Sequence, residues 1–355
     1  MNCVIISAKF SPPQMSHLAS ISMLLRELGH IPYLLLHPMY MSKLDDSGAI
    51  IYYLDQIDNM PAMDAAIIYN MSLQDTKILT KLQKANNCKT FFIYHEPWYG
   101  IDYWIKEFFH GGVKMNMLPR NVVIHYFAKK LLRMVDCVIL SSERGKEQYI
   151  KSDIKYNNMY KVFPLVFKDE TINLPHQKRE YFSYIATANK EKNFPLFIDF
   201  IAHYLPVDSS MKVQIITKTN IKEFWRPELD KYVENGRLLI QSGRNLDNEE
   251  INIALMRSCC SWLFYHHSTQ SGVLARAFMC GSPVLASNQG FQKYINGANG
   301  IICESEKLDD LYVAYQKIRQ NCEIMSLKSK ESFKMFDYKA YMDSFKNILN
   351  VDRKK

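Results

Sequence analysis

Apolar and polar stretches alternate along this chain in segments of strand and helix length. Short apolar runs predict strands, and longer segments whose apolar residues recur every three or four positions predict helices. In the first half we expect strands near 2–7, 32–37, 65–69, 90–95, 136–140 and 160–163, and helices near 16–29, 74–86, 121–134 and 143–151. In the second half we expect strands near 181–186, 212–217, 238–241, 261–265, 283–286 and 299–303, and helices near 194–204, 247–257, 272–280 and 308–320. Such alternation yields parallel sheets with helices on both faces, so each half is predicted to be a Rossmann-like α/β domain.

A polar stretch at 167–180, which contains Pro175 and several charges, is the best linker between the two halves. The length of 355 residues also exceeds what one hydrophobic core usually serves. We therefore expect an N-terminal domain over 1–170, a second domain over 171–335 and a C-terminal helix within 336–355 that packs back on the first domain.

The segment 261–290, SWLFYHHSTQSGVLARAFMCGSPVLASNQG, holds the most chemical information. An apolar strand is followed by a polar loop and then by a helix that must begin at Ser271-Gly272. The first N–H groups of a helix have no partners within the helix, the helix dipole adds positive charge there, and glycine lets an anion approach the backbone closely. The pattern predicts a site for a diphosphate.

This segment resembles the donor-binding region of retaining glycosyltransferases of family four, which have the GT-B fold and build bacterial polysaccharides. The run Met279-Cys280-Gly281, followed by a strand that Pro283 opens, matches the end of the family's helix. Gln270-Ser271-Gly272-Val273 matches the helix start found in a subset of the family. The family's two glutamates would fall at Ser268 and Arg276, so neither is present.

A second match lies at 181–194, which resembles the first strand and loop of the family's donor domain. There an arginine and a lysine usually clamp the diphosphate. Lys192 matches the lysine, whereas the arginine position holds Thr187, and Lys190 could replace the missing arginine. In the alternative interpretation, Lys190 and Lys192 only solvate the loop.

In the first half, two loops at expected strand ends carry candidate chemistry. Ser16 and His17 follow the first strand; Ser16 is a helix N-cap or a sugar ligand, and His17 can serve either role. The segment 94–100 places His95, Glu96, Trp98 and Tyr99 at the end of an apolar strand. His95 matches a histidine that family members place near the donor sugar, and Glu96 could orient it or act as a base. The alternative is a structural histidine with an aromatic cap on the sheet.

Together these features predict a site whose residues fall into three groups. The catalytic candidates are His95, Lys192 and Glu96; the donor-binding candidates are Thr187, Lys190, Gln270, Ser271, Gly272, Val273, Arg276, Gly243 and Arg244; the acceptor-binding candidates are Ser16, His17, Trp98 and Tyr99.

The resemblance implies two Rossmann-like domains whose sheets face one another across a cleft, with the acceptor on the N-terminal side. It implies transfer of a sugar, with retention, from a nucleotide-diphosphate donor to a saccharide or lipid-linked saccharide. It also implies no metal and no cofactor, the nucleotide sugar being a substrate. Two rivals remain open: a catalytically silent subunit that recognises an acceptor for a partner enzyme, and a nucleotide-sugar epimerase of GT-B shape.

Charge adds a membrane hypothesis. The net charge is +8, and the stretch 103–134 is basic and apolar together. This composition predicts docking on an anionic membrane, although an ordinary solvated helix fits equally well. No nucleic-acid recognition motif accompanies the charge. The first strand starts at Cys3 without a leader, and no run reaches about 20 apolar residues. The eight cysteines are scattered along the chain. We therefore expect a cytoplasmic protein that is peripheral at the inner membrane face.

Overall fold

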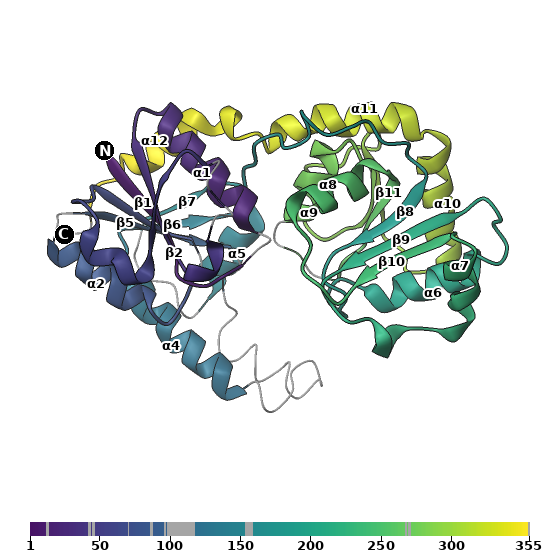
Figure 1. Ribbon diagram of the computed structural model, residues 1–355, viewed down its shortest axis with the longest axis horizontal. Coiled ribbons are helices and arrows are strands. Elements are labelled where there is room, and N and C mark those ends of the chain that lie inside the picture. The colour runs from purple at the N-terminus through teal and green to yellow at the C-terminus, as the bar shows by residue number, and fades with distance from the viewer. Residues whose placement is uncertain are drawn as a thin grey trace. The chain divides into compact units, whose positions relative to one another are not determined.

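A computed structural model describes residues 1–11, 14–41, 44, 47–69, 71–85, 88–95, 97, 118–152, 159–266, 268 and 271–353 (Figure 1). The chain forms two compact units. The first consists of Met1–Lys168 and Tyr338–Lys355, and the second of Asp169–Asp337.

Within its described residues, the first unit contains a seven-stranded parallel sheet in the order β3-β2-β1-β4-β5-β6-β7. Its strands are β1 (Asn2–Ser7), β2 (Ile31–Leu36), β3 (Ile50–Tyr53), β4 (Ala65–Ile68), β5 (Lys89–Tyr94), β6 (Cys137–Leu140) and β7 (Met159–Val162). Its helices are α1 (Met15–Glu27), α2 (Asp75–Ala85), α4 (Leu118–Met134), α5 (Glu143–Lys151) and α12 (Met342–Leu349). One core joins α1 and α12 to the sheet, and another joins α2 and α4 to its opposite face.

The second unit contains, in the part of the chain described, a six-stranded parallel sheet in the order β10-β9-β8-β11-β12-β13. Its strands are β8 (Tyr181–Ile185), β9 (Lys212–Thr217), β10 (Leu238–Ser242), β11 (Ser258–Leu263), β12 (Val284–Ser287) and β13 (Gly300–Cys303). Its helices are α6 (Phe194–Tyr204), α7 (Asp230–Glu234), α8 (Asn248–Met256), α9 (Gly272–Met279), α10 (Leu308–Gln320) and α11 (Cys322–Ser332). The helices α6 and α10 pack on one face around Trp262, whereas α8 and α9 cover the other (Figure 1).

The burial pattern explains why these runs form central strands. Strands β4, β6 and β11 are buried at every position, because helices cover both faces of each sheet. Strands buried on both faces have continuous apolar sequences rather than alternating ones. The prediction of an α/β fold with two doubly wound parallel sheets is therefore confirmed.

Two local expectations were wrong, and three elements were missed. Strand β11 ends at Leu263, not at residue 265, so Tyr265 lies in the following loop. Helix α1 begins at Met15 with Gln14 at its N-cap, so Ser16 lies inside the helix and does not cap it. Strand β3 and helices α7 and α11 were not expected at all.

Each sheet has one point where the strand order reverses. In the first unit the reversal lies between β1 and β4, and in the second it lies between β8 and β11. The connections that leave such a pair of strands run to opposite faces, so a crevice opens at the carboxyl ends of the two strands, where open α/β sheets bind ligands. Each unit thus has one topologically favoured site.

Candidate functional site

Two loops meet at the β8/β11 reversal of the second unit. The backbone N–H of His266, just after β11, donates a hydrogen bond of 3.0 Å to the carbonyl of Glu191, in the loop after β8. The hydroxyl of Tyr184 donates to the carbonyl of Thr187 at 2.9 Å and braces the same loop from β8. The loops that carry the two sequence matches are therefore held together.

Lys192 lies on a turn that is fixed at the residues before and after it. Its N–H donates to the side-chain oxygen of Asn189 at 2.8 Å. The next residue, Asn193, has a left-handed backbone with φ of 49° and precedes the first turn of α6. The ammonium of Lys192 lies 4.3 Å from the centre of the Tyr265 ring. The half-buried lysine is thus directed toward the loop after β11.

Helix α9 begins where the sequence predicts. Ser271 is its N-cap, with a side-chain oxygen that accepts a hydrogen bond from the N–H of Leu274 at 3.4 Å. Gly272 is the first helical residue and Val273 the second. Because the φ of Gly272 is not positive, a close approach to the backbone is a better reason for a glycine here than conformation. Gln270 lies outside the described residues.

Three buried polar groups at this junction lack a hydrogen-bond partner among the described residues. The first is the hydroxyl of Ser268, in the loop between β11 and α9, where the residue is only 2% exposed. The second is the side-chain nitrogen of Asn193, which is 4% exposed, and the third is the hydroxyl of Tyr265, which is 1% exposed. Buried polar groups almost always have a partner, so exceptions gathered at one junction fit a site that a polar ligand completes. Ser268 is also the position of the family's first glutamate.

Arg276, at the position of the second glutamate, is engaged within the protein. Its guanidinium donates to the side-chain oxygens of Asn248 at 2.7 Å and Asn252 at 3.2 Å, and lies 3.7 Å from the carboxylate of Glu170. Burial lowers the pKa of Arg276, and Glu170 opposes that shift. These contacts hold α9 against α8. A contact between Arg276 and a phosphate stays a prediction.

The remaining donor candidates lie on exposed loops. Thr187 and Lys190 are exposed in the loop after β8. Gly243 follows β10 with φ of 81°, and Arg244 pairs with the carboxylate of Glu250. Because β10 is two strands away from β8, Gly243 and Arg244 lie farther from the junction than Lys192 does.

The β1/β4 reversal of the first unit gathers a different set of groups. The side chain of His17, from α1, hydrogen-bonds the hydroxyl of Tyr69, which follows β4. The ring of His95, which follows β5, lies 4.8 Å from the ring of Tyr69 and 5.9 Å from that of His17. The hydroxyl of Ser141 donates to the carbonyl of His95 at 3.0 Å. The structure thus brings together two of the predicted residues and adds Tyr69.

Both histidines are neutral at pH 7. Burial lowers the pKa of His17 well below its usual range, and the neighbouring His95 lowers it further. Burial also lowers the pKa of His95, to about 4, although a hydrogen bond to the backbone of Tyr69 opposes the shift. An imidazole N–H that donates to a carbonyl leaves the other ring nitrogen as an acceptor. His95 can therefore accept a hydrogen bond from a hydroxyl.

The other candidates of the first unit are only partly described. Ser16 is buried inside α1. Glu96, Trp98 and Tyr99 lie outside the described residues, so their roles stay predictions.

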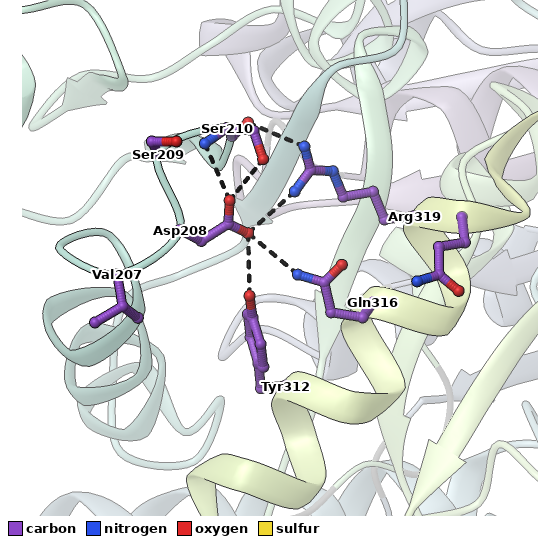
Figure 2. A pocket seen from close by; sticks show the side chains of 8 residues that line it. Val207, Asp208, Ser209, Ser210, Tyr312, Gln316 and Arg319 are labelled. Atoms are coloured by element: carbon purple, nitrogen blue, oxygen red, sulfur yellow. Dashed lines mark hydrogen bonds and ion pairs between the residues drawn. The ribbon is translucent and has the colours of Figure 1, made fainter.

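A separate polar hollow of about 500 Å³ lies between α10 and the loop after α6 (Figure 2). Figure 2 shows Asp208 at its centre, accepting hydrogen bonds from Ser210, Tyr312, Gln316 and Arg319. These partners lower the pKa of Asp208 against the effect of burial. Side chains of the protein itself donate to this carboxylate. The network therefore ties a loop to α10, and its geometry does not indicate a ligand site.

Comparison with known proteins identifies the architecture. No family model and no curated protein sequence matches the chain. Many solved structures do, among them a sucrose-phosphate synthase from Thermosynechococcus elongatus, with a TM-score of 0.68 and 14% identity over 98% of both chains. This synthase and the transferase GtfA, described below, are GT-B glycosyltransferases. The chain has the GT-B fold.

Two further structures contain nucleotide. Anabaena HepE, solved with UDP and glucose, has a TM-score of 0.68 and 11% identity over 99% of this chain and 100% of its own. The pneumococcal O-GlcNAc transferase GtfA, solved with UDP and GlcNAc, has a TM-score of 0.68 and 10% identity over 98% of both chains. At such identities the likeness establishes the fold only.

Sequence reasoning missed two residues of these junctions. Tyr265 and Tyr69 were each assigned to the end of a strand and not to a site. Each is an aromatic residue with a hydroxyl just after a buried strand at a reversal of strand order. That position was the available signal, because a side chain there lies at the edge of the crevice.

Proposed function

We propose that this protein is a glycosyltransferase that moves a sugar from a nucleotide-diphosphate donor to a saccharide or lipid-linked saccharide acceptor in polysaccharide biosynthesis. We assign it to the retaining, metal-independent type of family four. The observation that carries the proposal is the β8/β11 junction, where Lys192, the N-terminus of α9 and the partnerless hydroxyl of Ser268 lie on two connected loops. An ammonium and a helix N-terminus are the groups that bind a diphosphate.

In the proposed reaction, the bond between the sugar's anomeric carbon and the diphosphate oxygen breaks, and its electron pair stays on the diphosphate. Lys192 and the first N–H groups of α9 stabilise the developing negative charge. The acceptor oxygen bonds the anomeric carbon from the same face, and its proton passes to the departing phosphate. His95 accepts a hydrogen bond from the transferred sugar.

A thermal-shift screen tests the donor assignment. The protein is heated with UDP-, GDP-, ADP- and dTDP-sugars, and one donor class should raise the unfolding temperature in proportion to its concentration. Incubation of that donor with a saccharide or lipid-linked saccharide acceptor should then release the nucleoside diphosphate. Absence of any nucleotide-dependent shift would contradict the proposal.

The replacement of both family glutamates favours one rival, a catalytically silent subunit that binds an acceptor. Such a protein should show neither donor hydrolysis nor transfer at any enzyme concentration. An epimerase would instead interconvert nucleotide sugars without an acceptor. The same incubations therefore separate the three functions.

We also propose that α4 docks the enzyme on anionic membrane. Along this helix Val123, Tyr126, Lys130 and Arg133 are exposed at spacings of three, four and three residues, which place them on one face. Exposed aromatic and apolar groups can enter the interface while basic groups attract anionic headgroups. Within the described residues, no helix is both long and apolar enough to cross a bilayer.

Vesicle sedimentation tests the docking. Binding to anionic vesicles should exceed binding to neutral ones and should weaken at high salt. Charge reversal at Lys129, Lys130 and Arg133 should reduce it several-fold, whereas reversal at the exposed Lys77 and Lys84 of α2 should not. Equal partitioning of both variants would leave α4 an ordinary solvated helix.

A further inference from the structure

Tyr265 lies at the β8/β11 junction and is held rigidly there. Tyr265 is 1% exposed. Its backbone N–H donates to the carbonyl of Leu263 at 2.9 Å, and its carbonyl accepts from the hydroxyl of Ser287 at 2.5 Å. The ring of Phe291 meets its ring edge-on at 5.9 Å. Backbone and side-chain contacts therefore fix the plane of the Tyr265 ring.

The face of this ring carries the ammonium of Lys192 at 4.3 Å from the ring centre. A cation within about 6 Å of a ring centre is attracted by the negative face of the π-system. The residues next to this pair also join the two loops. The N–H of His266, which follows Tyr265, donates to the carbonyl of Glu191, which precedes Lys192. The contact thus has a backbone support that keeps its two partners in register.

An aromatic partner suits a lysine that must bind an anion. A carboxylate would hold the ammonium equally well, but it would neutralise the charge and compete with the ligand. A ring restricts the flexible four-carbon side chain without neutralising its positive charge.

We propose that Tyr265 is a positioning residue that holds the Lys192 ammonium, through its ring face, where it contacts the diphosphate of the donor. The inference rests on the proposed function and deepens it. In this proposal the ring, and not the hydroxyl, positions the ammonium. Phenylalanine at this position should therefore preserve the function, and an aliphatic residue should not.

The contact is tested first without any ligand. Lysine side chains are methylated with ¹³C, and the Lys192 signal is identified by its absence in Lys192→Arg. In the wild type and in Tyr265→Phe, the ring current should shift this signal upfield. Tyr265→Leu should remove the shift. Phe264→Leu, which removes a neighbouring buried ring, is the matched control and should leave the shift in place.

The consequence for binding is then measured by calorimetry with UDP, GDP and ADP, using the nucleotide that binds tightest. Tyr265→Leu should weaken binding about three- to tenfold, the scale of one cation–π contact. Tyr265→Phe and Phe264→Leu should bind as the wild type does. In a Lys192→Met background, Tyr265→Leu should have no further effect, because the partner is already gone.

Each outcome decides a separate claim. A wild-type Lys192 signal without a ring-current shift would overturn the inference. So would an equal loss of affinity from Tyr265→Leu with and without Lys192, because that result indicates a structural role only. If the wild type binds none of the three nucleotides or their sugars, the proposed function fails and the inference fails with it. If the wild type binds a nucleotide and the Tyr265 variants bind it with the same affinity, only the inference fails.

Discussion

The two reversal points of strand order have the same topology and opposite chemistry. The β8/β11 junction offers the ammonium of Lys192, the N-terminus of α9 and a partnerless hydroxyl at Ser268. The β1/β4 junction gathers the neutral rings of His17, Tyr69 and His95. The first set suits a strongly charged ligand, and the second suits uncharged hydroxyl groups.

Under the proposed function, this difference would divide the two substrates between the two junctions. Topology decides where each crevice lies, but the loop residues decide its charge. Burial lowers the pKa of both imidazoles, whereas the ammonium of Lys192 lies over an aromatic ring. Substitutions at the β8/β11 junction should therefore affect anion binding, and substitutions at the β1/β4 junction should affect only the transfer step.

The largest expected effect comes from Gly272→Val. A side chain at the first residue of α9 occupies the space through which a phosphate approaches the backbone, so donor binding should be abolished. At a donor concentration about 100-fold above the dissociation constant, the wild type gains about 2.7 kcal/mol of stability, and the variant should gain none. Gly272→Ala should give an intermediate result. Unchanged nucleotide affinity in the valine variant, with an unaltered circular dichroism spectrum, would refute the assignment.

Lys192→Ala should lower the rate of transfer roughly 100-fold, the scale of losing one main electrostatic stabiliser of the leaving group. Lys190→Ala is the matched control, because Lys190 is an exposed lysine on the same loop. Its loss should change the rate less than about threefold, as expected for a surface charge. The reverse order of the two effects would move the role to Lys190.

The sequence predicted the β8/β11 junction better than the β1/β4 junction. Ser271-Gly272 before an apolar run identifies a helix start locally, and the structure has α9 begin there. The end of β11 could not be predicted in the same way. Residues 264 and 265 are as buried as the strand itself, so hydropathy does not mark where the hydrogen-bonded ladder ends. Tyr265 was therefore assigned to the strand.

Contacts between distant parts of the chain explain the remaining differences. No sequence pattern around Arg276 indicates that its guanidinium will contact Glu170 and Asn252. Likewise, no local pattern pairs His17 with Tyr69, because the two meet only when β1 and β4 become neighbours in the sheet. Periodicity predicts elements, whereas these pairs follow from the order of the strands.

The neutral junction should make stability depend on pH. The pKa of His95 is about 4 in the folded protein and about 6.5 when unfolded, so between these values only the unfolded chain binds the proton. Stability is full above pH 6.5 and falls by up to about 1.4 kcal/mol per pH unit toward pH 4. His17 acts in the same direction, whereas Asp75, whose pKa burial raises to about 7, acts in the opposite one.

The difference between wild type and His95→Asn removes the opposing contribution of Asp75, which remains in both proteins. Urea unfolding at pH 7, 6 and 5 should show a gap that narrows as the pH falls, since the variant no longer takes up that proton on unfolding. Parallel stability curves would mean that the imidazole of His95 is already protonated in the folded protein or stays neutral in both states.

The smallest expected effect is that of His95→Ala on turnover. One hydrogen bond between neutral groups contributes about 0.5–1.5 kcal/mol, so transfer should slow about two- to tenfold while nucleotide affinity stays as in the wild type. Tyr69→Phe is a useful companion, because it removes the hydroxyl that His17 contacts and keeps the ring beside His95. It should slow transfer less than His95→Ala does. If His95→Ala instead weakened nucleotide binding as Lys192→Ala does, the two junctions would not divide the substrates, and the contrast between a charged and a neutral crevice would lose its functional meaning.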